Sequence, residues 1–272
     1  MSRVEIIAEA GVSHNGKLDL ALKLVDAAKT AGADVVKFQT YSPEAAIHPQ
    51  HRDFEFLKSL ALPHKDFLKL KKHCDEAQIE FLSTPGDLTS LKFLVEECGV
   101  CRIKIGSDDL TYRPLLLAAR ATGLPVILST GMATEQEIWV AVATINPILA
   151  SFTLLHCVSS YPCAIKDANL RAIPRLREKA ALPVGYSDHC QGYLACLTAV
   201  ALGAVMIEKH FELRDHKGPD HEVSITEYGL RKMVKRIREV ETMLGTGIKS
   251  PCEAELRNIP LVRKREDGRK MA

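Results

Sequence analysis

The sequence lacks an overall excess of charge and any apolar run long enough to cross a membrane. Its 36 Lys and Arg residues stand against 34 Asp and Glu, a formal net charge of +2, so no general basic field points to nucleic acid. No stretch approaches the roughly 18 apolar residues of a membrane span, and the amino terminus has no apolar signal core. These absences predict a cytoplasmic protein that binds neither nucleic acid nor membranes.

Paired cysteine motifs are also scarce, although the chain has eight cysteines. A chain of 272 residues that is 46% hydrophobic can bury a core without disulfide bonds, so we expect reduced thiols. Cys98 and Cys101 are spaced like half of a zinc or redox motif, but no second pair follows at zinc spacing. We interpret the spacing of this pair as a coincidence, because the two cysteines lie between the end of a predicted helix and the start of a predicted strand.

Short apolar runs alternate with helical patterns along most of the chain. Several runs are apolar throughout, as expected for parallel strands that are buried on both faces. The predicted strands are Val4–Glu9, Val35–Gln39, Ile79–Ser83, Cys101–Ile105, Val126–Ser129, Phe152–His156, Val184–Ser187 and Val205–His210. The predicted helices are Lys17–Ala31, Lys65–Ala77, Leu88–Glu97, Pro114–Ala121, Glu135–Ile145 with Thr134 as its N-cap, Leu170–Lys179, Tyr193–Leu202 and Glu227–Leu244.

This alternation predicts an α/β fold, a single (β/α)8 TIM barrel domain over residues 1–250, followed by a short polar tail over 251–272. The alternative is an open, doubly wound sheet. That fold would place a glycine-rich phosphate turn after the first strand. The run from Gly11 to Gly16 has neither the ending of a P-loop nor the spacing of a dinucleotide fingerprint.

Polar side chains end or follow almost every predicted strand, where the active sites of barrels lie. Leaving so many buried groups unsatisfied would cost roughly 1–3 kcal/mol each, so we expect them to face one another around a wet cavity. The set comprises Glu9, Lys37, Gln39, Ser83, Thr84, Lys104, Ser107, Ser129, Thr130, His156, Ser159, Ser160, Ser187, His189, Glu208 and His210.

Two histidines of this set lie one βαβ unit apart. His189 follows the seventh predicted strand and His210 ends the eighth, so a parallel sheet brings them to one edge. With Glu208 and Asp220 near in sequence, the pair predicts a divalent metal site with open positions. The alternative is that each histidine only bonds the backbone at a strand end.

Two lysines, Lys37 and Lys104, each interrupt an apolar strand. Together with neighbouring hydroxyl groups they could form a pocket for a phosphate and a carboxylate. The alternative is that each lysine forms an ion pair in the barrel core with Glu9 or Glu208. A hydroxylated or amide-bearing substrate could then be bound by a further set, Glu9, Gln39, Tyr161 and Asp220.

Ten runs carry the most specific pattern of the chain. They are residues 7–16 (IAEAGVSHNG), 32–40 (GADVVKFQT), 81–85 (FLSTP), 104–107 (KIGS), 126–132 (VILSTGM), 154–157 (LLHC), 161–162 (YP), 185–189 (GYSDH), 207–211 (IEKHF) and 218–220 (GPD). Together they resemble the catalytic barrel of the sialic acid synthase (N-acetylneuraminate synthase) family.

The resemblance implies a metal-dependent condensation of phosphoenolpyruvate with an N-acyl hexosamine such as N-acetylmannosamine, which gives a nine-carbon 2-keto sugar acid and phosphate. It implies metal ligands at His189 and His210, usually for Mn²⁺, with Mg²⁺ or Co²⁺ as alternatives. It implies catalytic roles for Lys37, Lys104, Asp109 and Glu9, and substrate contacts at Gln39, Thr84, Ser107, Ser129, Ser159, Tyr161, Ser187 and Asp220.

The sequence also departs from the family pattern. Asp109 stands where members usually carry a glutamate as a water-activating base, and Ser159 stands where they often carry asparagine. The C-terminal antifreeze-like domain, which in the family places an arginine on the sugar across a dimer, has no counterpart here. One hypothesis is that Arg263, Arg265 and Arg269 of the tail replace that arginine. The chain could also form a homodimer. Alternative functions are a synthase for a phosphorylated or diacetamido sugar, and a non-catalytic sugar-binding barrel.

Overall fold

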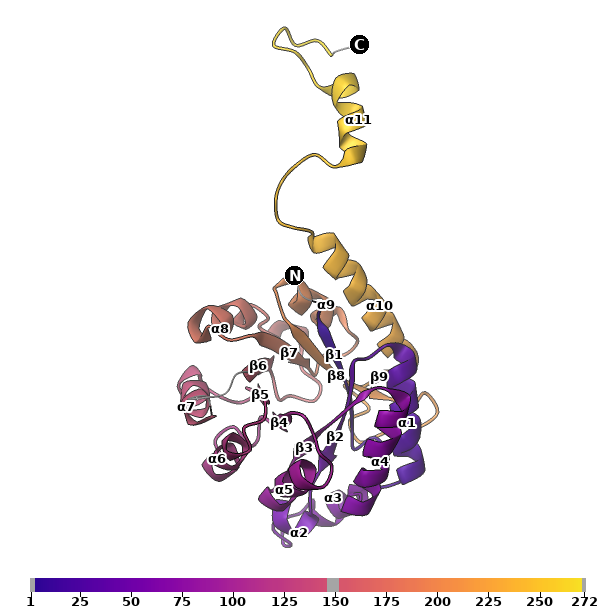
Figure 1. Ribbon diagram of the computed structural model, residues 1–272, viewed down its shortest axis with the longest axis vertical. Helices are drawn as coiled ribbons and strands as arrows, with labels where there is room; N and C mark the ends of the chain where they lie inside the picture. Colours follow the sequence, from indigo (N-terminus) through magenta and orange to yellow (C-terminus); the bar gives the residue numbers. More distant parts are fainter. Residues whose placement is uncertain (1–2, 146–151, 271–272) are drawn as a thin grey trace.

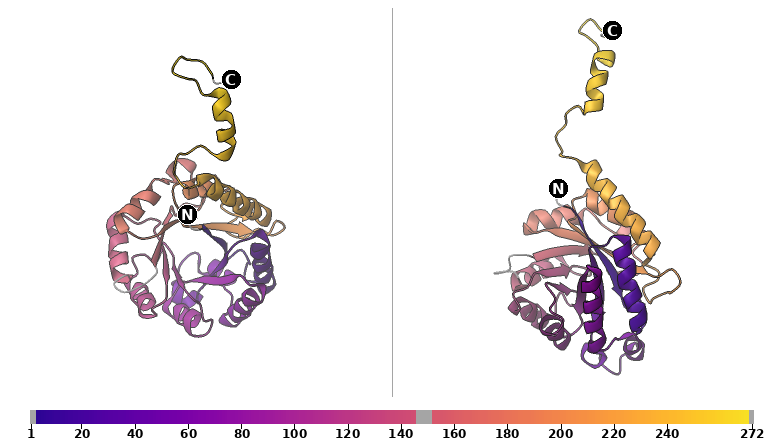
Figure 2. Two further views of the ribbon diagram at one scale, coloured as in Figure 1. Left: turned by 45° about the horizontal axis from the view of Figure 1, so that its top comes forward. Right: turned by 45° about the vertical axis from the view of Figure 1, so that its right-hand side comes forward.

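Eight parallel strands form a nearly closed barrel in the computed structural model, which describes residues 3–145 and 152–270 (Figures 1 and 2). The hydrogen-bonded order is β3-β2-β1-β8-β7-β6-β5-β4, and the short β9 pairs with β8. The strands are β1 Glu5–Gly11, β2 Val35–Thr40, β3 Glu80–Pro85, β4 Ile103–Ile105, β5 Val126–Ser129, β6 Phe152–Cys157, β7 Val184–Asp188, β8 Met206–Glu212 and β9 Ile225–Thr226.

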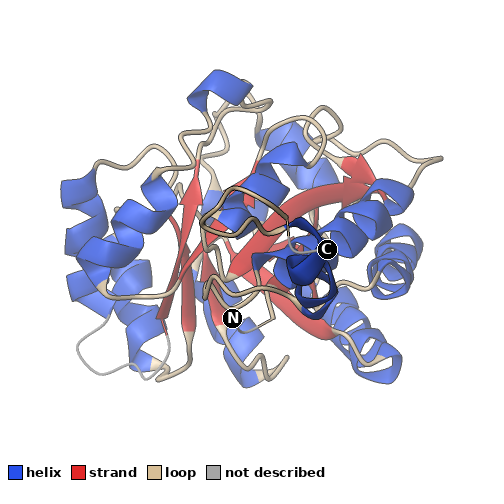
Figure 3. Ribbon diagram, turned by 90° about the horizontal axis from the view of Figure 1, so that it is seen from above, coloured by secondary structure: helices blue, strands red, loops and turns tan. Residues whose placement is uncertain are grey.

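Helices surround the barrel and separate successive strands (Figure 3). They are α1 Leu18–Ala31, α2 Pro43–Ala46, α3 Phe54–Leu60, α4 His64–Ala77, α5 Leu88–Glu96, α6 Arg113–Ala121, α7 Glu135–Ile145, the 3-10 helix η1 Ile165–Asp167, α8 Ala172–Ala180, α9 Leu194–Ala201, α10 Glu227–Leu244 and α11 Glu253–Val262. Thr134 caps α7 as predicted, because its Oγ1 accepts from the Glu137 amide at 3.3 Å.

The predicted (β/α)8 barrel is confirmed, and the open doubly wound sheet is wrong. In the barrel, β1 pairs with both β2 and β8, so the first and last strands of the repeat meet. Elements that the pattern did not predict are α2 and α3 between β2 and α4, the short η1 and β9, and α11 in the tail. The boundary at residue 250 stays a prediction, although α10 ends near it.

The two ends of the strand order, β3 and β4, meet at a seam that side chains bridge at the amino end. Arg102, just before β4, places Nε 2.6 Å from Oε1 of Glu80 at the start of β3. Its Nη1 lies 2.8 Å from Oε2 of Glu5 on β1. A guanidinium can bond both carboxylates through separate N–H groups. An ion-pair network therefore joins β3 and β4, the two strands that no backbone hydrogen-bond ladder connects.

The inside of the barrel is layered, with an apolar floor below a polar layer. The floor consists of Ile7, Val35, Leu82, Ile127, Leu155 and Met206. Two residues further along the same strands, alternation brings the next inward side chains, namely Glu9, Lys37, Thr84, Ser129, Cys157 and Glu208. On each of these strands, the inward-facing side chain changes from apolar to polar or thiol-bearing at the same level of the barrel. The polar site therefore begins at that level.

A larger apolar core lies between the strands and the helices. Helix α10, for example, buries Leu230, Met233, Val234 and Ile237 at helical spacing. The eight cysteines are all free, with Cys98 buried and Cys101 exposed, in agreement with the prediction of reduced thiols. Among the described residues, no helix is both long and apolar enough to cross a membrane.

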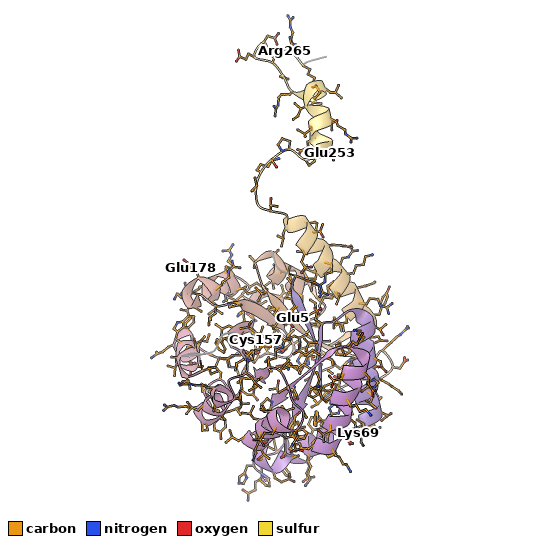
Figure 4. All side chains as sticks on the ribbon, viewed as in Figure 1. Glu5, Lys69, Cys157, Glu178, Glu253 and Arg265 are labelled. Carbon is orange, nitrogen blue, oxygen red and sulfur yellow. The ribbon has the colours of Figure 1, made fainter. Side chains whose placement is uncertain are left out.

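The tail leaves the barrel on the side opposite the carboxyl ends of the strands. Helix α10 runs back along the barrel from β9, so it ends near the amino ends of the strands. Figure 1 shows α11 projecting beyond that point, and Figure 4 labels Arg265 far from Cys157 of the polar layer. The hypothesis that tail arginines complete the site is therefore wrong for this chain's own barrel.

Candidate active site

A cavity of about 620 Å³ opens at the carboxyl ends of the strands. All the predicted site residues except Asp220 line it: Glu9, Lys37, Gln39, Thr84, Lys104, Ser107, Asp109, Ser129, Ser159, Tyr161, Ser187, His189 and His210. Asp220 lies beside the cavity, with Oδ2 3.4 Å from Nδ1 of His210. The structure therefore brings these residues together, whereas the role of each residue stays a prediction. The expectation that every polar strand end faces the cavity is wrong for four of them, which do not line it: Ser83, Thr130, His156 and Ser160. Their side chains bond elsewhere, to Thr40 Oγ1 and to the carbonyl oxygens of Leu155, Ala168 and Pro162 respectively.

Two lysines and two carboxylates form the base of this cavity. Lys37 Nζ lies 2.8 Å from Oε2 of Glu9 and 3.6 Å from Oε2 of Glu208. Lys104 Nζ lies 3.9 Å from Oε1 of Glu208. The ion pairs named as the alternative to an anion pocket are thus present, but all four groups also line the cavity. An anionic ligand could share both lysines with them.

Burial and mutual attraction set the ionisation of this cluster. Burial opposes the charge of Lys37, but the carboxylates of Glu208 and Glu9 outweigh it and raise its pKa. Burial dominates at Lys104 and lowers its pKa. Burial would raise the pKa of Glu208, but the two lysines bring it down to about 2. The pKa of Glu9 is raised, chiefly by burial.

Hydroxyl groups complete the lysine end of the cavity. Lys104 donates to Ser129 Oγ at 2.7 Å, and Lys37 donates to Thr84 Oγ1 at 3.1 Å. Ser187 donates to Oε1 of Glu208 at 2.8 Å. Because hydroxyls rotate and can also donate to an anion, these groups fit a phosphate or carboxylate held by the lysines.

The Gly131 backbone fits closely between two of the predicted serines. Its amide donates to Ser107 Oγ at 2.9 Å. A Cβ at this position would lie 2.1 Å from Ser159 Oγ and 2.8 Å from Ser107 Oγ. Any larger residue would push the serines apart, so glycine here preserves the shape of the pocket wall.

The two histidines lie side by side at the opposite end of the cavity. The ring centroids of His189 and His210 are 5.3 Å apart. His189 Nδ1 lies 2.8 Å from the carbonyl oxygen of Val158, so it donates there and leaves Nε2 as a free lone pair. Burial lowers the pKa of His189 to about 4, which keeps the ring neutral. A neutral imidazole is the form that binds a metal.

The two histidines fit a divalent cation that takes most of its ligands from water or substrate. Among the described residues, no group of three or more His, Cys, Asp or Glu is arranged to hold a metal. His210 has the carboxylate of Asp220 beside Nδ1, an outer partner of the kind that orients metal-binding imidazoles. Two imidazoles would thus leave the remaining positions open to water or substrate.

The rim beside the histidines carries the groups predicted to contact a sugar. The Tyr161 ring centroid lies 4.0 Å from that of His189 and 5.8 Å from that of His210. Gln39 Nε2 donates to Oε1 of Glu9 at 3.3 Å. An aromatic face, an amide and a carboxylate at one rim can pack against a ring and bond its hydroxyl groups.

A cluster of aspartates follows β3 and β4 on the far side of the mouth. Burial, then the charges of Asp108 and Asp87, raise the pKa of Asp109 to about 6. Asp87 is already bonded, since it accepts from the backbone amides of Ser42 and Ser90. Asp109 is therefore a carboxylate that can take up a proton close to neutral pH.

Several residues that line the cavity were not among the predicted catalytic, substrate-binding or metal-binding residues. Glu208, predicted only as a neighbour of the metal site or an ion-pair partner of a lysine, contacts both lysines. Its spacing of two residues from His210 on β8 places it on the same face of the strand. Met132 and Asp108 also line the cavity, as do Tyr41, Ala46, Ile47 and Leu57 from the segment between β2 and α4. No local pattern marked that segment as part of the site.

A second acid–lysine pair lies behind the histidines, between the barrel and α9. Lys209 and Asp188 are each fully buried, with Nζ 3.0 Å from Oδ2. Asp188 also accepts from Tyr186 Oη at 3.0 Å and from the Cys190 amide at 2.9 Å. Because Asp188 precedes His189 and Lys209 precedes His210, the pair fixes the two strands where they present their imidazoles.

Comparisons with known proteins agree on one family. A sequence model of the NeuB family matches residues 24–249. The N,N'-diacetyllegionaminic acid synthase of Legionella pneumophila is 41% identical over 95% of this chain and 78% of its own length. The human N-acetylneuraminate-9-phosphate synthase is 32% identical over 91% of this chain and 74% of its own. The crystal structure of an N-acetylneuraminic acid synthetase from Leptospira borgpetersenii superposes with a TM-score of 0.90, at 40% identity, covering 97% of this chain and 94% of that one.

Proposed function

This chain belongs to the NeuB family and is a synthase that condenses phosphoenolpyruvate with a sugar; we propose that the sugar is an N-acyl hexosamine of the N-acetylmannosamine type. The product would be a nine-carbon 2-keto sugar acid. The observation that carries this proposal is a single cavity with two buried lysines at its base and two adjacent imidazoles at its other end. That arrangement suits one anionic and one aldehyde substrate.

Phosphoenolpyruvate would bind at the lysine end. Its phosphate and carboxylate are matched by Lys37 and Lys104, and by the hydroxyls of Ser129 and Thr84 that these lysines already contact. In a buried site such fixed charges stabilise the charge that develops on departing phosphate. Both lysines therefore serve binding and leaving-group stabilisation.

A cation held by His189 and His210, for which we propose Mn²⁺, would when bound polarise the aldehyde oxygen of the sugar as a Lewis acid. Tyr161, whose ring centroid lies 4.0 Å from that of His189 with the two rings tilted by 32°, would cover part of that end from solvent. Gln39 and Glu9, joined by a hydrogen bond, would hold hydroxyl or amide groups of the same substrate. The sugar is thereby oriented with its aldehyde carbon toward phosphoenolpyruvate.

The bonds made and broken follow from this placement. The C3 carbon of phosphoenolpyruvate attacks the aldehyde carbon, the aldehyde oxygen takes up a proton and becomes a hydroxyl group, and positive charge grows on C2. Water adds to C2 and gives up a proton, for which Asp109, with its pKa raised to about 6, is the proposed base. Phosphate then leaves C2, and the remaining oxygen becomes the 2-keto group.

A histidine substitution tests the proposal. His189→Ala should abolish phosphate release from phosphoenolpyruvate and N-acetylmannosamine, and should weaken Mn²⁺ binding measured by calorimetry on the same sample. The matched control is His48→Ala, an exposed histidine that does not line the cavity, which should leave both measurements unchanged.

Two outcomes would count against the proposal. Full phosphate release by His189→Ala would refute the role of this histidine. Thermal stabilisation of the unaltered protein by phosphoenolpyruvate and Mn²⁺, without phosphate release for any sugar, would favour the non-catalytic sugar-binding barrel.

A further inference from the structure

Three ionisable side chains occupy alternate positions at the end of β8. Glu208, His210 and Glu212 are each two residues apart, so they share one face of the strand. Glu208 contacts the lysines and His210 lies beside His189, but Glu212 has no role in the proposed reaction. It is only 3% exposed and does not line the cavity. A buried carboxylate needs hydrogen-bond partners, and those partners indicate what Glu212 does.

The Glu212 carboxylate bonds the segment that follows β8, residues 213–224, which we call the β8 loop. Oε2 accepts a hydrogen bond from the Gly218 amide at 3.1 Å. Oε1 accepts from Nδ1 of His221 at 2.5 Å. Residues 218 and 221 stand on either side of Asp220. One buried carboxylate therefore holds the β8 loop at two points that bracket Asp220.

A second set of contacts holds the β8 loop against the segment that follows β1. Asn15 Nδ2 donates to the carbonyl oxygen of Lys217 at 3.1 Å. A Cβ on Gly218 would lie 2.6 Å from Ser13 Oγ, so the backbone of the loop packs directly on that segment. The β8 loop therefore has a defined place beside the cavity, and the Gly218 amide that Glu212 binds is part of this contact.

The Asp220 side chain meets the end of the cavity where the aldehyde would lie. Its Oδ2 is 3.4 Å from Nδ1 of His210, a buried nitrogen with no hydrogen-bond partner among the described residues. A Cβ on Gly11 would lie 3.6 Å from Asp220 Oδ2, 3.5 Å from Gln39 Nε2 and 3.2 Å from Glu9 Oε1. Any shift of Asp220 would therefore affect the imidazole and the proposed sugar-binding groups together.

On the premise of the proposed function, we infer that Glu212 is a positioning residue for the metal and acceptor end of the site. It does not line the cavity, so it acts through other residues. By holding residues 218 and 221, it keeps the Asp220 carboxylate beside Nδ1 of His210, and an outer partner of this kind orients a metal-binding imidazole. The lysine end of the cavity has no contact with this arrangement.

The first test replaces the carboxylate by an amide of the same size. Glu212→Gln has one acceptor oxygen in place of two, so one of the two bonds to the β8 loop is lost. Mn²⁺ affinity, measured by calorimetry without substrates, should fall about ten-fold, the lower end of the range for outer partners of metal ligands. The KM for N-acetylmannosamine should rise, whereas the KM for phosphoenolpyruvate should stay unchanged.

A double-variant cycle shows whether Glu212 acts through Asp220. Asp220→Asn should by itself weaken Mn²⁺ binding, because a neutral amide is a weaker partner for the imidazole N–H than a carboxylate. Glu212→Gln should then have little further effect in this background, since the carboxylate that it positions is absent. A glutamate that only stabilised the fold would lower the free energy of unfolding and leave the Mn²⁺ affinity of the folded chain unchanged.

Two further variants serve as a safeguard and a control. His221→Ala removes one of the two Glu212 bonds at a side chain that is 44% exposed, so this variant should fold and should lose less Mn²⁺ affinity than Glu212→Gln. It decides the test if Glu212→Gln does not fold. Glu222→Gln is the same substitution at an exposed glutamate of the β8 loop. This matched control should leave the Mn²⁺ affinity and both KM values unchanged.

The outcomes separate the inference from its premise. Folded Glu212→Gln and His221→Ala variants with unchanged Mn²⁺ affinity, or losses that add fully in the double variant, would overturn the inference and leave the synthase intact. An unaltered chain that neither binds Mn²⁺ nor releases phosphate with any sugar would overturn the proposed function itself.

Discussion

Strand β8 takes part in two acid–lysine clusters, one on each of its faces, and the two clusters differ in how fully their polar atoms are paired. On the outer face, Asp188 and Lys209 are fully buried, and both Asp188 oxygens accept hydrogen bonds. On the inner face, Oε2 of Glu208 accepts no hydrogen bond from the described residues and lies 3.6 Å from Lys37. The inner cluster faces the cavity, whereas the outer one faces α9.

The difference shows that the same pairing of a carboxylate with a lysine can stabilise the fold in one place and bind a ligand in another. A buried ion pair with every partner in place contributes to the position of its strands, and removing one partner leaves an uncompensated charge. A cluster beside a cavity that has an unpaired hydrogen-bond acceptor can exchange its internal ion pairs for contacts with a ligand. We therefore expect the inner cluster to control activity and the outer cluster to control stability.

The largest expected effect is on activity, at the inner cluster. Lys104→Met should lower kcat/KM for phosphate release on the order of 10³-fold, because a fixed charge at the departing phosphate is lost. The free energy of unfolding should stay unchanged or increase, since burial already disfavours the charge of Lys104 and lowers its pKa. Activity assays and chemical denaturation check the two parts. A large loss of stability would contradict the assignment.

The next effect is on stability, at the outer cluster. Lys209→Met should lower the free energy of unfolding by about 3–5 kcal/mol, because Asp188 would stay buried without its cation. The double variant Asp188→Asn with Lys209→Met should recover part of this loss, since no unpaired charge remains. Denaturant unfolding curves provide the measurement, and a single variant as stable as the unaltered chain would refute the proposed role.

The pH dependence of activity tests the role of Asp109 at the mouth of the cavity. The proposed base Asp109 works only as a carboxylate, and its pKa is raised to about 6 by burial and by the charges of Asp108 and Asp87. Activity should therefore fall as pH decreases through about 6. Asp108→Asn should shift this limb to lower pH, because one of the charges that raise the pKa is removed. A limb that does not move would exclude Asp109 as the group observed.

The sign for stability at Asp109 is opposite to that of a salt-bridged carboxylate. Because its pKa is raised on folding, the folded chain holds this proton more tightly than the unfolded chain does. The stabilising contribution is present below the usual pKa of about 4 and is lost as pH rises through about 6. Asp109→Asn should remove this part of the pH dependence of unfolding, measured by denaturation at pH 4 to 8.

The smallest effect is expected at an exposed pair, which serves as the reference for Lys209. Lys72 and Glu76 are one helical turn apart on α4, with Nζ 3.7 Å from Oε1. Lys72→Met should change the free energy of unfolding by less than about 0.5 kcal/mol, because exposed pairs are screened by water and salt. A loss comparable to that of Lys209→Met would show that burial is not what separates the two clusters.

Much of the candidate site could be predicted because it lies on strands. Lys37 and Lys104 stood out as charges within apolar runs, and His189 and His210 as residues one βαβ unit apart. The segment between β2 and α4 could not be placed in the same way. Its turns and prolines fix no face, and its contact with the cavity depends on bonds to Asp87, 45 positions from Ser42. Manganese, the cytoplasmic location and a homodimer remain predictions.

The sequence by itself determined which side chains face inward, because a period of two residues assigns alternate positions of a strand to opposite faces. That rule alone separates Glu208 and His210 from Lys209. Only the tertiary structure decided which inward groups become partners, such as Lys37 with both Glu9 and Glu208. Local patterns cannot fix those pairs, because strand register and closure of the barrel bring together residues that are distant in sequence, such as Lys37 and Glu208, which are 171 positions apart.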